Sequence, residues 1–215
     1  MSFGIQIRLT ESSSEIAKSI NELLAKTINR RLPRVFARAQ DVIKEQVLEG
    51  IRNQPEYQSL ISGTLKHEFG LPDAASRVDS ILNILEQSMV IKYEKSLGTP
   101  SGVRGGFTIE FVRADYGDLL SAPDATFVTE KGSNLEWLNW LLVQGDNSIV
   151  LGYEFVLGSS IFSRTGSGVM KSNLSGFWRV PPEFAGSLDN NWITRGILSV
   201  ESIIEKYLVE LIQDM

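Results

Sequence analysis

The chain has 215 residues, of which 42% are hydrophobic and 22% charged, enough for the core of one large domain or two small ones. Its 21 basic and 26 acidic residues give a net charge of −5, which weighs against a nucleic-acid-binding protein of the usual basic kind. With no cysteine and a single histidine, His67, the chain excludes disulfides, iron–sulfur clusters, thiolate zinc sites, cysteine nucleophiles and histidine-rich metal sites within one subunit.

The N-terminal part of the sequence has mainly helical spacing. Residues 5–9 alternate apolar and polar side chains, which predicts a short strand. Apolar residues then recur at helical spacing through 16–28 and again through 35–51. Because proline removes a backbone donor and clashes with the preceding turn, Pro33 predicts either two helices or one helix bent near residues 31–33.

Three shorter elements are expected next. Residues 55–60 begin with a proline, which suits the first turn of a short helix. The stretch 64–69 lies between turns expected at two glycines. Apolar spacing over 78–85 predicts a further amphipathic helix, with Asp73 as its N-cap.

Beyond residue 88 the pattern changes to that of strands. Residues 89–94 and 107–113 alternate as strands do, and the Gly, Ser and Pro-rich stretch 97–106 between them is predicted to be a mobile loop.

The remaining elements are a short strand near 126–129, a compact helix over 134–143 and an apolar strand over 149–157. Residues 158–191 are predicted to be loop-like. The clearest helical stripe is the terminal one, over 193–212.

This order predicts a single α+β domain. It would contain a mainly helical part (1–88), a β-rich part with mobile loops and a small antiparallel sheet (89–192), and a C-terminal amphipathic helix packed on that sheet (193–215).

No motif selects a catalytic, metal or cofactor site. The glycine-rich stretch 163–171 lacks the lysine that must follow the second glycine of a phosphate-binding loop. His67 and Glu68 begin like a zinc-protease motif, but position 71 is leucine rather than histidine. No nucleophile elbow occurs, so we expect no enzyme, no metal and no cofactor.

Arg30, Arg34 and Arg38 stand four residues apart and share one helix face, with Arg31 nearby. Three interpretations stay open: a solvated face, a contact with DNA phosphates, or a contact with an acidic partner such as a neighbouring copy. The acidic residues of that copy's terminal helix are Glu201, Glu205, Glu210 and Asp214.

The segment around Trp178, Pro181, Pro182 and Phe184 combines aromatic residues with a rigid double proline. Such a segment either packs on the core or lies as an extended arm over a neighbouring subunit. We favour the arm, which makes these four residues candidate interface residues together with the three arginines and Arg164.

The C-terminal part of the chain, from residue 149 onward, resembles a known family. The strand at 149–157 is followed by an Arg-Thr-Gly-x-Gly-Val-Met loop at 164–170, a Pro-Pro-x-Phe-Ala-Gly segment at 181–186, and Asn-Asn-Trp-Ile-Thr-Arg opening the terminal helix at 190–195. This succession resembles virion proteins of tailed bacteriophages, in particular the tail-completion or head–tail joining proteins of the neck.

The resemblance implies a structural protein of the neck: a tail terminator, a tail-completion protein or a head–tail connector. It implies a ring of six or twelve copies around the DNA channel, synthesised and assembled in the host cytoplasm and retained in the virion. Adjacent neck, tail-tube or sheath proteins would be its partners, and the genome would pass through without sequence-specific binding. The Gly-rich loops 97–106 and 163–172 would gain order on docking.

Two alternatives remain: another virion component, such as a baseplate or minor tail protein, and a metal-dependent hydrolase with an unrecognised site. The purely apolar runs are far shorter than the roughly 20 residues that cross a bilayer, so we expect no membrane partner.

Overall fold

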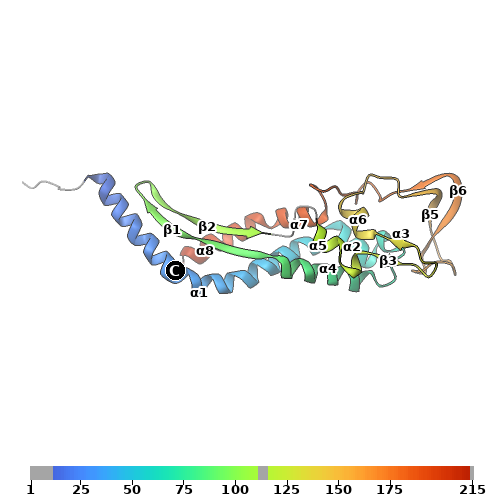
Figure 1. Cartoon of the computed structure of the whole chain (residues 1–215), viewed down its shortest axis with the longest axis horizontal. Helices are drawn as coiled ribbons and strands as arrows, with labels where there is room; N and C mark the ends of the chain where they lie inside the picture. The colour runs from blue at the N-terminus through green and yellow to red at the C-terminus, as the bar shows by residue number, and fades with distance from the viewer. Residues whose placement is uncertain (1–11, 111–115, 214–215) are drawn as a thin grey trace, which may run out of the picture. The chain divides into compact units, whose positions relative to one another are not determined.

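A computed structural model describes residues 12–110 and 116–213 of the chain (Figure 1). It confirms the mixed α+β class, with a long N-terminal helix, small antiparallel sheets and C-terminal helices. The strand expected at 5–9 lies outside the described residues, and so does the predicted strand segment 111–113.

The first helix, α1 (Ser13–Arg52), runs unbroken for 40 residues with Pro33 inside it. The sequence left two alternatives open for this region. The prediction of two separate helices is wrong, and the prediction of one long helix is confirmed. Ser12 and Glu15 cap its start reciprocally: the Ser12 amide donates to the Glu15 carboxylate at 2.7 Å, and the Glu15 amide donates to Ser12 Oγ at 3.3 Å. The Ser12 amide and the Ser12 hydroxyl both donate to the Glu15 carboxylate, and these two hydrogen bonds lower the pKa of Glu15.

Three helices follow: α2 (Pro55–Ser62), α3 (Thr64–Glu68) and α4 (Ala74–Ser88). Helices α2 and α4 were expected, whereas the sequence predicted only the turns on either side of α3. Asp73 occupies the N-cap position of α4, but its side chain makes no capping hydrogen bond. It instead accepts a hydrogen bond from Arg77 Nε at 2.9 Å, and this contact lowers the pKa of Asp73.

Strands β1 (Val90–Thr99) and β2 (Gly102–Glu110) form an antiparallel hairpin closed by a turn at Pro100 and Ser101. The prediction of a ten-residue loop over 97–106 is therefore wrong. Its glycines belong to the strands: Gly105 lies so close to the backbone of Ser96 that an added Cβ would come within 2.9 Å of the Ser96 Cα.

A set of short elements connects the two hairpins: α5 (Gly117–Leu120), the 3₁₀ helix η1 (Pro123–Ala125), β3 (Phe127–Val128), β4 (Asn134–Leu135) and α6 (Trp137–Leu142). The helix expected over 134–143 is shorter than predicted because its first two residues pair with β3. Trp137 is fully buried and donates its indole N–H to the Asp124 carbonyl at 2.8 Å.

The strand expected over 149–157 is β5 (Val150–Leu157), but its partner was not expected. Residues 158–191, predicted to be loop-like, contain β6 (Gly168–Trp178), which pairs antiparallel with β5 from Val150↔Trp178 to Leu157↔Gly168. The eleven residues of β6 include two glycines, two serines and an asparagine, which disguise its strand pattern.

The terminal helical stripe is two helices, α7 (Trp192–Ser199) and α8 (Glu201–Gln213), joined at Val200. Asn191 caps α7 by accepting hydrogen bonds from the amides of Ile193 and Thr194, both at 3.1 Å. Helix α7 packs on α1 through glycine: a Cβ added at Gly196 would lie 2.6 Å from the Ile51 Cα.

The described residues group into two compact units. The first contains 12–42, 90–110 and 206–213, and its buried side chains include Leu32, Ala39 and Ile91. The second contains 43–89 and 116–205, with a larger core. No helix in the described ranges combines the length and the apolar character needed to cross a membrane.

Candidate functional site

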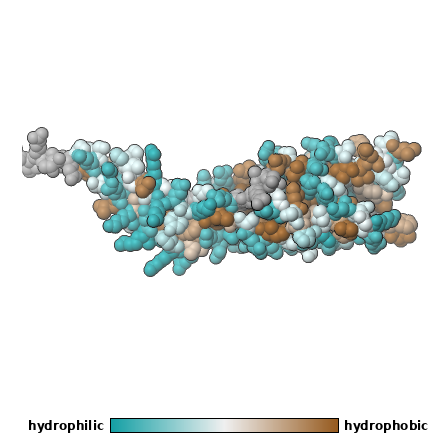
Figure 2. All heavy atoms as spheres, viewed as in Figure 1, coloured by the Kyte–Doolittle hydropathy of each residue, from teal (hydrophilic) through white to brown (hydrophobic). Residues whose placement is uncertain are grey.

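The β5–β6 hairpin of the second unit exposes large apolar side chains. Leu151 and Phe177 face each other across the two strands and are 74% and 57% exposed. Leu174, in the part of β6 where the register shifts, is fully exposed. Hydrophobic surface is visible in Figure 2 in the region where Figure 1 labels these strands. Exposed apolar residues gathered on one element are typical of a binding surface.

The loop 158–167 that joins the two strands also exposes large apolar side chains. Ile161 is 93% exposed and Phe162 is 81% exposed. Together with Leu151, Leu174 and Phe177 they form what we call the hairpin surface. No sequence motif marks it; the available signal was two large apolar residues between serines in a segment without helical or strand spacing.

Polar contacts hold the same loop to α3 and to the turn that follows it. Arg164 Nε donates to the Gly70 carbonyl at 3.0 Å, and Thr165 Oγ1 lies 2.8 Å from His67 Nδ1. The Arg164 guanidinium also lies 5.7 Å from the centre of the Phe127 ring. Burial lowers the pKa of Arg164, and the carboxylate of Glu130 opposes that shift. Arg164, predicted as an interface residue, therefore fixes the loop within its own subunit.

Trp178 anchors the other end of the hairpin. It is 6% exposed, donates its indole N–H to Glu68 Oε2 at 2.8 Å, and packs edge-on against Phe69 and Trp140. Burial raises the pKa of Glu68, the Trp178 hydrogen bond lowers it, and the nearby Glu183 adds a smaller upward shift. Trp178 is thus a core residue that positions the hairpin surface rather than part of that surface.

The double proline makes a compact turn rather than an extended arm. The Phe184 amide donates to the Pro181 carbonyl at 2.8 Å, and Val180, immediately before the turn, is fully buried. Pro182 is exposed, whereas Pro181 and Phe184 are half-buried. The arm interpretation is wrong for the chain as described, because the segment folds back against its own core.

The four arginines predicted to lie on or near one helix face form what we call the arginine strip. Arg30, Arg34 and Arg38 are all exposed on α1, as is Arg31. Within the described ranges none of the four makes an ion pair. The structure brings these arginines together on one helix, and they belong to the first unit, whereas Arg164, Trp178 and the prolines belong to the second.

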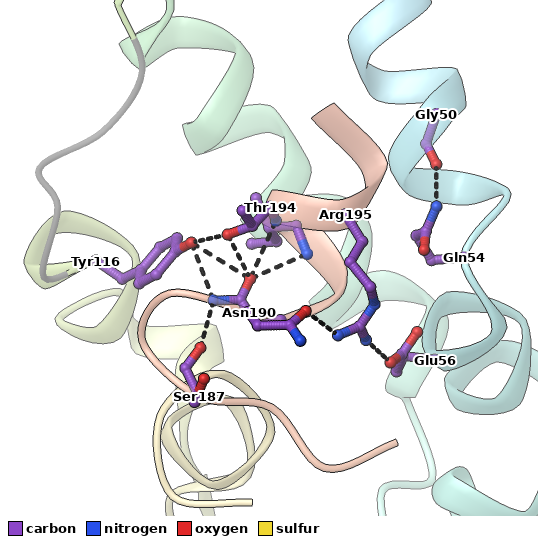
Figure 3. A network of polar contacts seen from close by, with 10 residues as sticks. Gly50, Gln54, Glu56, Tyr116, Ser187, Asn190, Thr194 and Arg195 are labelled. Atoms are coloured by element: carbon purple, nitrogen blue, oxygen red, sulfur yellow. Dashed lines mark hydrogen bonds and ion pairs between the residues drawn. The ribbon is translucent and has the colours of Figure 1, made fainter. Parts of the chain in front are cut away.

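Polar side chains form a hydrogen-bonded network around the start of α7 (Figure 3). Asn191 is fully buried, and its amide group bonds Tyr116 Oη at 3.0 Å and the Ser187 carbonyl at 3.0 Å. Arg195 donates to Asn190 Oδ1 at 2.9 Å and pairs with the buried carboxylate of Glu56. These contacts satisfy a helix N-terminus and join α7 to α2, a structural role.

Glu56 is the most deeply buried carboxylate among the described residues, at 1% exposed. Burial raises its pKa, while its own backbone amide and the Arg195 guanidinium oppose the shift. No group of three His, Asp or Glu side chains suited to a metal ion occurs within 12–110 and 116–213. His67 lines a shallow open depression with small side chains, among them Thr64, Ser159 and Ser167.

Comparisons with known proteins identified no similar protein. No family model, no curated protein and no solved structure matches this chain.

Proposed function

We propose that this protein is a structural subunit of a tailed-bacteriophage virion and forms part of the neck ring that joins head to tail around the DNA channel. The observation that carries the proposal is the hairpin surface, five large exposed apolar side chains on one hairpin held firmly at both ends. Support also comes from the resemblance of residues 164–170, 181–186 and 190–195 to neck proteins.

The physical case for association rests on what burial of this surface would contribute. A large apolar side chain contributes about 1.5–3 kcal/mol when it passes from full exposure to full burial. A two-stranded hairpin alone is marginally stable in water and leaves an unpaired edge on each strand. A neighbouring subunit that covers Ile161, Phe162 and Leu174 would bury apolar surface that the hairpin now exposes to water.

Two of the segments that resemble neck proteins, 181–186 and 190–195, make contacts that stabilise the fold. Gly186 lies against α6, where an added Cβ would come within 2.3 Å of the Leu141 carbonyl oxygen, and Asn191 caps α7. Both details hold the double-proline turn and α7 in place near the hairpin base. They fit a protein whose C-terminal region presents a preformed surface to a neighbour.

In the proposed ring, each copy presents the hairpin surface to a different face of the next copy, so the contact is heterologous and closes by rotation. Six or twelve copies would surround the channel, with adjacent neck, tail-tube or sheath proteins above and below. Assembly would take place in the host cytoplasm and the ring would stay in the virion.

The native mass of the purified chain, followed by negative-stain imaging of any large species, tests the proposal. The account predicts a mass that is a multiple of 23.9 kDa and closed rings with a central channel. A compact monomer that binds no virion protein and shows metal-dependent thermal stabilisation would contradict it and favour an enzyme.

A further inference from the structure

The solvent-facing side of α1 carries two kinds of residue in a fixed order. Leu23 is 66% exposed, and Arg30 and Arg34 follow seven and eleven residues later. At 3.6 residues per turn these three side chains fall within about 40° of one another, opposite the buried Leu32 and Ala39. We call this set the α1 stripe; it is apolar first and basic afterwards.

Helix α8 carries the complementary order. Glu201 and Glu205 are exposed in its first part, and Val209 and Ile212 are 52% and 39% exposed in its second. Helical periodicity places the four within about 80° of one another, and the buried Ile204 lies outside this arc, about 60° beyond Glu201. This α8 stripe is acidic first and apolar afterwards.

The two stripes match when the helices run antiparallel. Seven residues separate Leu23 from Arg30 and Ile212 from Glu205, and eleven separate Leu23 from Arg34 and Ile212 from Glu201. Both longer intervals span about 16 Å of helix. One antiparallel register therefore places Leu23 on Ile212, Arg30 beside Glu205 and Arg34 beside Glu201.

The chain itself leaves both stripes uncovered. Their apolar members are more than one-third exposed. None of Arg30, Arg34, Glu201 and Glu205 makes an ion pair within residues 12–110 and 116–213. Every copy carries both stripes. A second copy of the chain therefore offers the α1 stripe a surface of opposite charge and complementary apolar order.

We propose that the α1 stripe of one copy packs antiparallel on the α8 stripe of the next copy, in the register Leu23–Ile212, Arg30–Glu205 and Arg34–Glu201. This inference rests on the self-association in the proposed function and names a contact that the hairpin surface does not. Two different faces of the chain meet, so the contact is heterologous and repeats from copy to copy, as a ring requires.

Charge reversal on each side tests the register by sedimentation velocity over a range of protein concentrations. Arg30→Glu/Arg34→Glu and Glu201→Arg/Glu205→Arg should each raise the concentration at which the assembly dissociates by about tenfold or more, because two attractive pairs become repulsive. A mixture of the two variants, and a chain with all four reversals, should recover assembly to within about threefold of the parent.

Arg38→Glu is the matched control. It makes the same change of charge on the same helix, but in this register Arg38 lies beyond the first residue of α8 and faces no glutamate. We expect it to shift the dissociation concentration by less than about threefold. Circular dichroism melts of every variant check that the helices remain folded.

Three results would overturn the pairing. Folded reversal variants that assemble like the parent would reject it and leave the neck-ring proposal standing, because the rings would still form. Variants that fail to assemble alone, mixed and in the four-fold combination would show that these residues act without the proposed partners. A parent chain that stays monomeric at every concentration would reject unaided self-association, and the pairing with it.

Discussion

The two long hairpins of this protein have the same topology but opposite relations to the rest of the chain. In the β1–β2 hairpin, side chains of α1 satisfy the backbone of β1. Asn29 accepts from the Ser96 amide and donates to the Ser96 carbonyl, both at 2.8 Å, and Asn21 donates to the Thr99 carbonyl at 2.7 Å. Gln40 makes a longer contact with the Ile91 carbonyl at 3.4 Å.

The β5–β6 hairpin is held mainly at its two ends, by Trp178 at the base and Arg164 in the loop. Between these anchors its apolar side chains face solvent. The β1–β2 hairpin also exposes Val90 and Leu97, but α1 already bonds to its β1 backbone. The contrast teaches that helix α1 bonds to the backbone of one hairpin, whereas the other hairpin leaves large apolar side chains exposed to solvent.

The largest expected effect is at the base of β5–β6. Trp178→Ala removes a buried indole that packs between Phe69 and Trp140 and should lower the free energy of unfolding by about 3–5 kcal/mol. Urea unfolding followed by circular dichroism measures the loss. A cost below about 1 kcal/mol would show that the hairpin base is not part of the core.

A smaller loss is expected where α1 meets β1. Asn29→Ala leaves the Ser96 amide and carbonyl without their partner, which should cost about 1–3 kcal/mol and speed hydrogen exchange of the Ser96 amide. Arg30→Ala, one residue further on the exposed face, is the control and should leave that exchange unchanged. Equal protection in both variants would show that α1 does not stabilise this strand.

Next comes the hairpin surface itself. Ile161→Ser/Phe162→Ser removes exposed side chains, so the free energy of unfolding of the monomer should change by less than about 0.5 kcal/mol, while self-association weakens about tenfold or more. Leu198→Ser, at a position 60% exposed on α7, provides a matched control. Sedimentation velocity of the double variant and of the control measures their self-association. Loss of assembly in the control alone would place the contact elsewhere.

The smallest effect is electrostatic. Burial raises the folded-state pKa of Glu68 above its ordinary value of 4.5, so this carboxyl contributes most to stability when protonated and loses that contribution as pH rises. Glu68→Gln keeps an acceptor for Trp178 and removes the titration. The variant should gain stability relative to the parent between pH 4 and pH 7, as shown by thermal melts; an opposite trend would mean that the ionised carboxylate is the favoured form.

Much of the fold followed from periodicity, and the errors have local causes. Helices α1, α2 and α4 were predicted because apolar spacing and a leading proline determine them locally. Strand β6 was missed because its glycines, serines and asparagine are poor strand formers that pairing with β5 overrides. The glycines at 105 and 106 indicated a loop, whereas close backbone approach in a hairpin is what requires Gly105.

The candidate site was harder to predict than the fold. The arginine strip follows from i, i+4 spacing alone, and the structure leaves it exposed as that spacing allows. Arg164, Trp178 and the double proline were predicted to be interface residues. In the structure Arg164 and Trp178 instead bond to Gly70 and Glu68 of their own chain, and the double proline forms a compact turn. Exposure of Ile161 and Phe162 depends on the folded loop, which no local pattern encodes.

Hydrogen exchange of the protein, compared between dilute monomer and concentrated assembly, tests the contrast between the hairpins most directly. The account predicts that amides of the loop 158–167 and of β6 near Leu174 gain protection on assembly. It also predicts that β1 amides such as that of Ser96 are already protected in the monomer and change little. Assembly that protects β1–β2 and leaves the β5–β6 hairpin unchanged would contradict the account.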